Sequence, residues 1–215
     1  LMAEGGTEYG HKVVIARSKN IDGPYDADPA NPILTHIRRV TQNSSIQGVG
    51  HPDIVQASDG SWWMVVLAFR HRSMHHLLGR ETFIAPVEWT KDEWPVVNKN
   101  GTLALDMNVP TLPQYPYPEQ PARDDFTGPA LGFSWNYPGN PVTENYSLTA
   151  RPGYLRLKGD TSNITQGKRV TFTGRRQQHE NFSAITSLDF MPLNETDEAG
   201  LTVFMDYKAH YDLSV

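Results

Sequence analysis

The chain has 215 residues, enough for one large or two ordinary domains. Its formal net charge of −5 at pH 7 argues against a protein that binds nucleic acid or an anionic membrane, because such proteins present a basic face. With 38% hydrophobic and 20% charged residues, the composition is globular, and no apolar run approaches the roughly 20 residues that cross a bilayer. The absence of cysteine excludes disulfides, thiolate metal sites and thiol nucleophiles.

Asn-x-Ser/Thr sequons are more frequent than chance, which gives about one or two in a chain of this composition. The surplus favours a secreted, glycosylated, eukaryotic (fungal-like) protein over the plainer interpretation of a surface rich in Asn and Thr. The N-terminal residues show no signal peptide, so we expect the sequence to be a fragment of a longer chain. The sequon asparagines are Asn43, Asn100, Asn145, Asn163, Asn181 and Asn194.

Short β-type runs separated by turn residues predict an all-β chain, since no window repeats apolar residues at helical spacing. In the N-terminal half, strands are predicted over 11–17, 53–57, 62–69 and 81–88, with a hairpin loop at 58–61. The run 62–69 has large apolar residues on both faces, so we expect it to be buried on both sides, as in a propeller blade. Spacing alone leaves propeller and sandwich open.

Five prolines between residues 106 and 123 predict an extended, stiff linker. The predicted domains are therefore residues 1–106 and 124–215, joined by a linker at 107–123. Beyond the linker, strands are predicted over 154–158, 170–173, 182–190 and 201–207, at a spacing that fits a β-sandwich.

Three histidines lie together at His71, His75 and His76. A zinc site is conceivable, since imidazole is a common zinc ligand. However, the run has no carboxylate, and the β-type surroundings do not predict the helical spacing that would bring two histidines to one metal. The pattern favours a polar loop.

Three other residues stand where a ligand could bind. His51 follows glycines that let the backbone approach another group closely, although an exposed loop histidine fits equally well. Arg80 begins a predicted strand, where its guanidinium could hold a carboxylate or sugar hydroxyls, or pair with Glu81. Thr7 lies in a glycine-rich stretch, where its hydroxyl could bind a ligand or simply stabilise a turn.

Carboxylates are the groups that glycoside cleavage requires, in pairs. The candidates are Glu4, Glu8, Asp53 and Asp59, and spacing singles out none of them. Asp59 fits a turn. No GxSxG, phosphate-binding loop or GxGxxG occurs, so serine-hydrolase, NTPase and dinucleotide-binding functions lack support.

Six segments, taken together and in order, resemble glycoside hydrolase family 43, the β-xylosidase and α-L-arabinofuranosidase family. In the N-terminal half these are AEGGTEYGHKVVIARSKNIDGPYD (3–26), NPIL (31–34), GVGHPDIVQASDGSWWMVVLAFR (48–70) and LGRETFIAPVEW (78–89). DDFTGPALGFSWNYP (124–138) and YSLTARPGYLRLKG (146–159) resemble the start of the β-sandwich that follows the catalytic propeller in one branch of the family. Each motif is weak alone, but the combination is specific.

The resemblance implies an all-β fold, with a partial five-bladed β-propeller followed by an incomplete concanavalin-like β-sandwich. It implies a fragment of an inverting exo-glycosidase that hydrolyses xylo-oligosaccharides or arabinoxylan. Family members use a general base Asp, a second Asp that tunes the pKa of the acid, and a general acid Glu. All three are expected upstream of Leu1, so this chain alone is expected to be inactive. The alternative is a catalytically silent carbohydrate-binding or structural β protein, and the upstream sequence would distinguish the two.

Three positions match functional residues of the family. Thr7, in EGGT, matches a pocket threonine near the sugar, and Arg80, in LGRET, matches an arginine that contacts the sugar near the acid. His51, in GHPD, matches a histidine at the propeller axis that supports a structural calcium ion or its waters. Because calcium prefers oxygen ligands, one histidine cannot build that site, and water would fill most of the shell.

Overall fold

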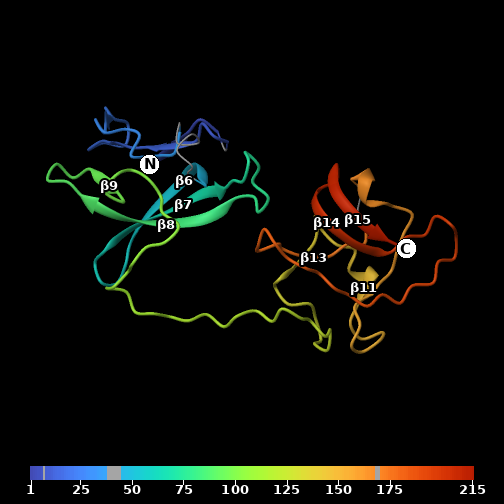
Figure 1. The fold of residues 1–215 in the computed structure, drawn as a ribbon. Coiled ribbons are helices and arrows are strands. Elements are labelled where there is room, and N and C mark those ends of the chain that lie inside the picture. The colour runs from blue at the N-terminus through green and yellow to red at the C-terminus, as the bar shows by residue number, and fades with distance from the viewer. Residues whose placement is uncertain (7, 38–44, 168–169) are drawn as a thin grey trace. The chain divides into compact units, whose positions relative to one another are not determined.

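The computed structural model describes residues 1–6, 8–37, 45–167 and 170–215, and these form an all-β structure (Figure 1). The chain divides into two compact units, Leu1–Pro116 and Tyr117–Val215. Residues 107–123, which contain the prolines, have neither helix nor strand. The helices of the described part are single 3-10 turns, at Thr143–Asn145 and Ile164–Gln166. None of them has the length and hydropathy of a membrane-spanning segment.

The largest sheet of the first unit is an antiparallel meander in the order β6-β7-β8-β9. Its strands are β6 (Ile46–Gln56), β7 (Trp62–Arg70), β8 (Glu81–Trp89) and β9 (Pro95–Val97). The strands predicted over 53–57, 62–69 and 81–88 are confirmed, although β6 begins well before residue 53.

The hairpin loop predicted between β6 and β7 is also confirmed. The Ala57 N–H donates to the Ser61 carbonyl at 2.8 Å, and the Gly60 N–H donates to the Ala57 carbonyl at 3.0 Å. Asp59 Oδ1 accepts from the Ser61 N–H and hydroxyl, at 3.0 and 2.6 Å. These hydroxyl and amide bonds lower the pKa of Asp59, with a further bond from Thr111. Asp59 is therefore a turn residue, as predicted.

A smaller sheet in the order β1-β2-β5 contains β1 (Met2–Glu4), β2 (Lys12–Val14) and β5 (Leu34–Thr35). The strand predicted over 11–17 is divided, because β3 (Ala16–Arg17) leaves this sheet to pair with β4 (Asp26–Ala27). At the division, the Asn31 side chain takes the place of a neighbouring strand. Its Oδ1 accepts from the Ile15 N–H at 2.9 Å, and its Nδ2 donates to the Ile15 carbonyl at 2.8 Å.

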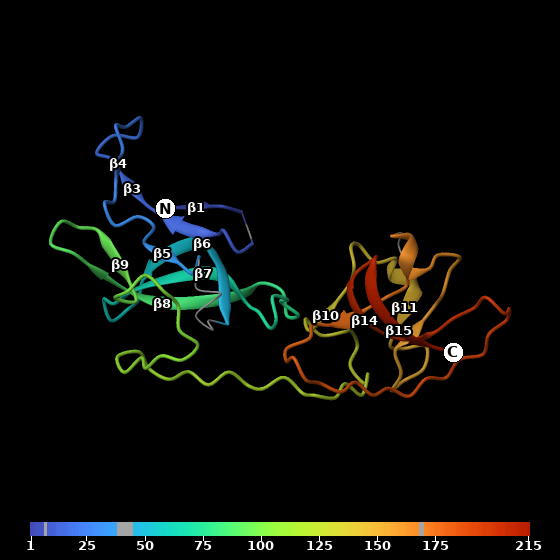
Figure 2. The ribbon, with the colours of Figure 1, turned by 45° about the horizontal axis from the view of Figure 1, so that its top comes forward.

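The core of the first unit lies between these two sheets. Val13 and Leu34 of the smaller sheet are fully buried in the same cluster as Val49, Met64 and Val66 of the larger one. Figure 2 shows β1 and β5 lying over β6 and β7. Successive antiparallel sheets that stack in this way are typical of neighbouring blades in a propeller.

The central strand β7 differs from its prediction in one respect. Met64, Val66 and Ala68 are buried in the core, and Phe69 is fully buried on the opposite face. Val65 and Leu67 on that opposite face are only half buried, so the middle of the strand is not buried on both faces as predicted. A hollow lies beside them.

The second unit consists of two-stranded ladders. They are β10 (Trp135–Asn136) with β13 (Gly174–Arg175), β11 (Tyr146–Ser147) with β12 (Arg156–Leu157), and β14 (Gly200–Asp206) with β15 (Ala209–Ser214). The strand predicted over 201–207 is confirmed, and the one over 154–158 is confirmed in its centre. The strands predicted over 170–173 and 182–190 are wrong. In the second case Ile185 is 95% exposed, so its alternating apolar pattern has no partner to bury it.

Candidate functional site

A hollow of about 260 Å³ opens on the face of the meander beside Val65 and Leu67. Three strands line it: β6 contributes His51 and Asp53, and β7 contributes the apolar side chains of its floor. Arg80, just before β8, and Glu81 and Thr82 at the start of β8 close it. An apolar floor with a few convergent polar groups is the usual composition of a small-molecule site.

A bulge in β6 places His51 in this hollow. Gly50 pairs with Leu67 and Asp53 pairs with Val65, so His51 and Pro52 together oppose a single residue of β7. His51 itself has φ of 52°, a left-handed conformation that few non-glycine residues adopt. Bulges of this kind redirect a side chain, and left-handed residues gather at functional sites. The backbone conformation at the bulge therefore determines where the exposed imidazole of His51 lies.

The glycines before His51 are required by close packing, as the sequence predicted, and the approaching groups are side chains of the same unit. A Cβ on Gly48, whose φ is 65°, would lie 2.2 Å from the Phe69 ring. A Cβ on Gly50 would lie 2.0 Å from the ring of His11, whose Nδ1 lies 3.1 Å from the Gly48 carbonyl oxygen. The packing of two aromatic rings against β6 thus supports the bulge.

Arg80 lies on the opposite side of the hollow from β6, ahead of the first residue of β8. The sequence left open whether Arg80 pairs with Glu81, and in the structure Glu81 binds Arg70 instead. Arg70 Nε donates to Glu81 Oε2 at 3.0 Å, and Arg70 Nη2 donates to Oε1 at 2.8 Å. Among the residues that the structure describes, Arg80 has no hydrogen bond or ion pair. Arg80 lines the hollow, and its guanidinium donors are not engaged by other described groups.

The other predicted residues lie elsewhere. Thr7 lies outside the described residues. Residues 71–76 form a turn closed by a bridge between Arg72 and His75, as the loop prediction required. Tyr9 packs edge-on against His71 at 5.9 Å between ring centroids, and its hydroxyl donates to the Met74 carbonyl at 2.8 Å. Burial raises the pKa of Tyr9, and the charge of Glu8 adds to the effect.

The residues around His51 do not by themselves make a calcium shell. Calcium takes six to eight oxygen ligands. Within the described part of the chain, no three His, Asp or Glu side chains gather in a way that could hold a metal ion. Near His51 the hollow offers the Asp53 carboxylate, while that of Glu81 is held by Arg70. Calcium binding near His51 therefore stays a prediction, because these residues alone do not supply enough oxygen ligands.

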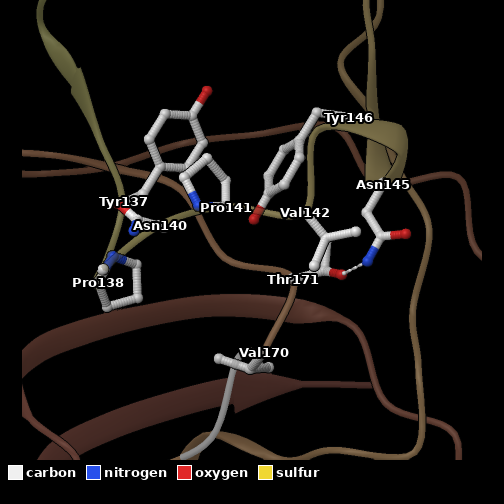
Figure 3. Close-up of a pocket in the computed structure, with 10 residues that line it drawn as sticks. Tyr137, Pro138, Asn140, Pro141, Val142, Asn145, Tyr146, Val170 and Thr171 are labelled. Carbon is white, nitrogen blue, oxygen red and sulfur yellow. Dashed lines mark hydrogen bonds between the residues drawn. The ribbon is translucent and has the colours of Figure 1, made fainter.

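A second hollow lies in the second unit, beside Tyr137, Tyr146 and Thr171 (Figure 3). Its volume is about 10 Å³, which admits one water molecule and no sugar. The Tyr146 hydroxyl donates to the Phe172 carbonyl at 3.0 Å and accepts from the Phe172 N–H at 2.9 Å. Figure 3 also shows Asn145 Nδ2 donating to Thr171 Oγ1, at 3.0 Å. These bonds hold loops together, so this hollow is structural.

The sequence analysis did not identify Arg70 as the ion-pair partner of Glu81. The signal was present in the pattern of the two strands. Ala68 pairs with Glu81 across β7 and β8, so Arg70, two residues further, lies on the same face and diagonally opposite the carboxylate. Detecting this requires the register of the pair, which the sequence alone does not specify.

Comparison with known proteins gives two family matches. The model of glycosyl hydrolases family 43 matches residues 1–95, and that of the beta xylosidase C-terminal concanavalin A-like domain matches residues 123–215.

Two of the similar proteins are bacterial. The chain is 45% identical to the non-reducing end alpha-L-arabinofuranosidase BoGH43B of Bacteroides ovatus, over all of this chain and 40% of that protein. It is 34% identical to a xylan 1,3-beta-xylosidase of a Vibrio species, over all of this chain and 42% of that protein. The solved structure of Bacteroides ovatus Xyloglucan PUL GH43B matches with a TM-score of 0.88 and 43% identity, over 99% of this chain and 42% of that one.

The chain thus spans about two fifths of the length of the curated relatives it matches. The two family models account for both units, and the solved relative reproduces their folds. The chain therefore belongs to glycoside hydrolase family 43, in which it carries a fragment of the β-propeller followed by a concanavalin A-like β-sandwich domain.

Proposed function

We propose that this chain forms part of an inverting exo-glycosidase that hydrolyses xylo-oligosaccharides or arabinoxylan, and that its hollow binds the terminal pentose. The observation that carries the proposal is the unpaired guanidinium of Arg80, a residue that lines the same hollow as His51. The names of the relatives support the substrate class, since they are an arabinofuranosidase and a xylosidase. The family motif around Arg80 supports its role.

In this proposal, Arg80 binds and orients the sugar. Its planar fork of donors can hold two hydroxyl oxygens at once, and its charge persists at any working pH. A cation close to a general acid also lowers the pKa of that acid. Thr7 would add a hydroxyl contact to the sugar, and His51 would lie beside the propeller axis. The proposal assigns the base, the modulating Asp and the acid to sequence upstream of Leu1. Neither Asp53 nor Glu81 takes their place.

The test is substitution of Arg80 in the full-length gene product, assayed on nitrophenyl xyloside and arabinofuranoside. Arg80→Lys should lower kcat/KM by about 30-fold or more, because lysine lacks the fork and loses a charged hydrogen bond in a desolvated site. Arg80→Ala should lose at least as much, with unchanged circular dichroism and Tm. Values within threefold of wild type for both variants would contradict the role. Proton NMR of the first sugar released should show inverted anomeric configuration.

The alternative of a silent carbohydrate-binding protein makes a different prediction for the same preparation. It expects binding of xylo-oligosaccharides by calorimetry with no hydrolysis of either substrate. The hollow of the second unit gives this alternative no support, since it is too small for a sugar.

We also propose that the protein is secreted and glycosylated. Among the five described sequon asparagines, four are exposed, and Asn145 is half buried with its amide bonded to Thr171. Asn43 lies outside the described residues. After secretion from yeast, glycan release by an amidase in oxygen-18 water should convert each glycosylated Asn to labelled Asp at the exposed sites and leave Asn145 unmarked. The exposed sites are Asn100, Asn163, Asn181 and Asn194. The proposal would be contradicted if all four were unmarked.

A further inference from the structure

The connection between β7 and β8, residues 71–79, leads directly into Arg80 and contains two successive turns. We call it the β7–β8 loop. The first turn is closed by two backbone hydrogen bonds, at 2.8 and 2.9 Å, and the second by one at 3.2 Å. The second turn ends at Gly79, and Arg80 follows. The way in which this loop is held therefore bears directly on where Arg80 lies.

The tip of the β7–β8 loop has a conformation that its own residues do not favour. Ser73 and Met74 have left-handed φ values of 49° and 67°. Non-glycine residues stay in this region where the surrounding structure holds them. The loop buries little apolar surface, since Met74 is 50% exposed and Leu77 is 64% exposed. Contacts from other parts of the chain are therefore needed to keep the tip in place.

Tyr9 supplies such a contact at the left-handed residue itself. Its hydroxyl donates to the Met74 carbonyl at 2.8 Å, and the two residues are 65 positions apart in sequence. Its ring packs edge-on against Phe69 at 5.4 Å between centroids, and Phe69 contacts His76 of the loop at 4.5 Å. Burial raises the pKa of Tyr9, so the hydroxyl keeps its proton and stays a donor through the neutral pH range.

We infer that Tyr9 is a positioning residue for the sugar site: its hydroxyl holds the tip of the β7–β8 loop and thereby keeps Arg80 in place to bind the ligand. This inference rests on the proposed function for the identity of the ligand and for the role of Arg80. Tyr9 also stands two positions after Thr7 in the sequence. One hydrogen bond thus joins the two segments whose residues are proposed to bind the sugar. Tyr9 acts through the loop and is assigned no contact with the reacting atoms.

The test is a double-mutant cycle between Tyr9→Phe and Arg80→Ala in the full-length gene product, assayed on nitrophenyl xyloside. Phenylalanine keeps the ring and removes only the hydroxyl. Tyr9→Phe should lower kcat/KM about three- to tenfold, because Arg80 is then less often in its binding position. In the Arg80→Ala background the same change should cause no further loss, since the group that Tyr9 positions is gone. Wild-type kinetics in Tyr9→Phe, or losses that add in the double variant, would overturn the inference.

Tyr25→Phe is the matched control for the loss of a tyrosine hydroxyl. The Tyr25 hydroxyl donates to the Ile21 carbonyl at 2.7 Å, a bond of the same kind in the same unit but within one short segment. This variant should keep kcat/KM within about twofold of wild type. Equal losses of activity in Tyr9→Phe and Tyr25→Phe would point to a general loss of stability and would also overturn the inference.

Hydrogen exchange followed by mass spectrometry reports on the loop without any catalysis. The amides of residues 71–79 should exchange about three- to tenfold faster in Tyr9→Phe, because loss of the bond makes local opening more frequent. They should exchange at the wild-type rate in Tyr25→Phe. Unchanged exchange in Tyr9→Phe would overturn the inference even in an active enzyme. Absence of hydrolysis in the wild type would refute the proposed function, whereas faster exchange confined to the loop would still uphold the role of Tyr9 in holding it.

Discussion

At the scale of single residues, the candidate site depends on a histidine held in a conformation that most side chains avoid. His51 has φ of 52° within a strand, between residues that pair normally with β7. Among non-glycine residues, His, Asn and Asp tolerate this region best, whereas β-branched residues tolerate it worst. The choice of residue at position 51 is therefore constrained by the backbone as well as by chemistry.

Two substitutions separate these constraints. His51→Asn should change the free energy of unfolding by less than about 0.5 kcal/mol. His51→Val should lower it by about 1–2 kcal/mol, because a β-branched residue is strained in the left-handed conformation. Both remove the imidazole, so both should lower kcat/KM of the full-length protein by about tenfold or more if the imidazole serves the site. Urea unfolding and steady-state kinetics provide the two measurements. An Asn variant with wild-type kinetics would show that His51 serves the fold alone.

In the second unit, Asp124 is a residue whose ionisation contributes to stability. The Trp135 indole N–H donates to Asp124 Oδ2 at 2.8 Å, and the Phe126 N–H donates to Oδ1 at 2.9 Å. These bonds, with a smaller contribution from the charge of Arg175, lower the pKa of Asp124. Because the folded pKa lies below the unfolded one, the contribution is complete above the unfolded pKa of about 3.9 and is lost as pH falls through the folded value.

Asp124→Asn should accordingly destabilise the second unit by about 0.5–1 kcal/mol near pH 7, a charged hydrogen bond reduced for its exposure to solvent. The difference between variant and wild type should shrink as pH falls below about 3.9. Thermal unfolding at pH 7, 5 and 3 measures it. A difference that persisted at pH 3 would mean that the carboxylate charge is not its source.

At the scale of elements, the strand β6 is bent by two bulges, and glycines make room for the rings that pack against it. Gly48 and Val49 together oppose one residue of β7, as do His51 and Pro52. Each bulge therefore shifts the alternation of β6 by one position. This shift places Val49 in the core cluster with Ile46, three residues earlier, whereas strict alternation would put it on the opposite face.

Alanine at Gly48 tests the packing, with Gly60 as its control. Both glycines have positive φ, 65° and 86°, but a Cβ on Gly60 meets nothing within 4 Å. Gly60→Ala should cost about 1 kcal/mol of backbone strain, and Gly48→Ala about 1–3 kcal/mol more from the clash with Phe69. Urea unfolding of the first unit measures both. Equal losses at the two positions would show that Phe69 moves aside without cost.

At the scale of the whole molecule, the two units differ in how they bury apolar surface. All of the fully buried large side chains belong to the first unit, within the part that the structure describes. In the second unit, the cross-strand pairs Leu201–Leu213 and Val203–Tyr211 lie on one face of β14–β15, and these side chains are 37–84% exposed. The opposite face is covered, since Phe204 contacts Phe172 at 5.2 Å between ring centroids. Such a contiguous apolar face promotes association.

We expect the 215-residue chain, expressed alone, to aggregate through this face. Leu213→Lys should slow aggregation several-fold, measured by light scattering at a fixed concentration, without changing circular dichroism. Phe204→Lys, on the covered face, is the control and should unfold the unit instead. A wild-type chain that stays a soluble monomer with a sharp cooperative melt would contradict the expectation.

Features set by residues close together in the sequence could be predicted, whereas features set by residues far apart in the sequence could not. The strands β7, β8 and β14 and the loop at 58–61 follow from local pattern, because turn residues and apolar alternation act over a few positions. The division of the strand at Ile15 did not follow, since the backbone groups of Ile15 are bonded there by Asn31, sixteen residues away. The strands wrongly predicted over 170–173 and 182–190 show the same limit, because a pattern forms a strand only where a partner exists.

For the candidate site, the sequence by itself determined the family, through motifs that combine specifically, and with it the choice of His51 and Arg80. Only the tertiary structure decided that these two residues share one hollow, and that Glu81 belongs to Arg70 and leaves Arg80 unpaired. The physical reason is that ion pairs and bulges are determined by strand register. Register depends on the packing of sheets whose strands are distant in sequence, and no local pattern encodes it.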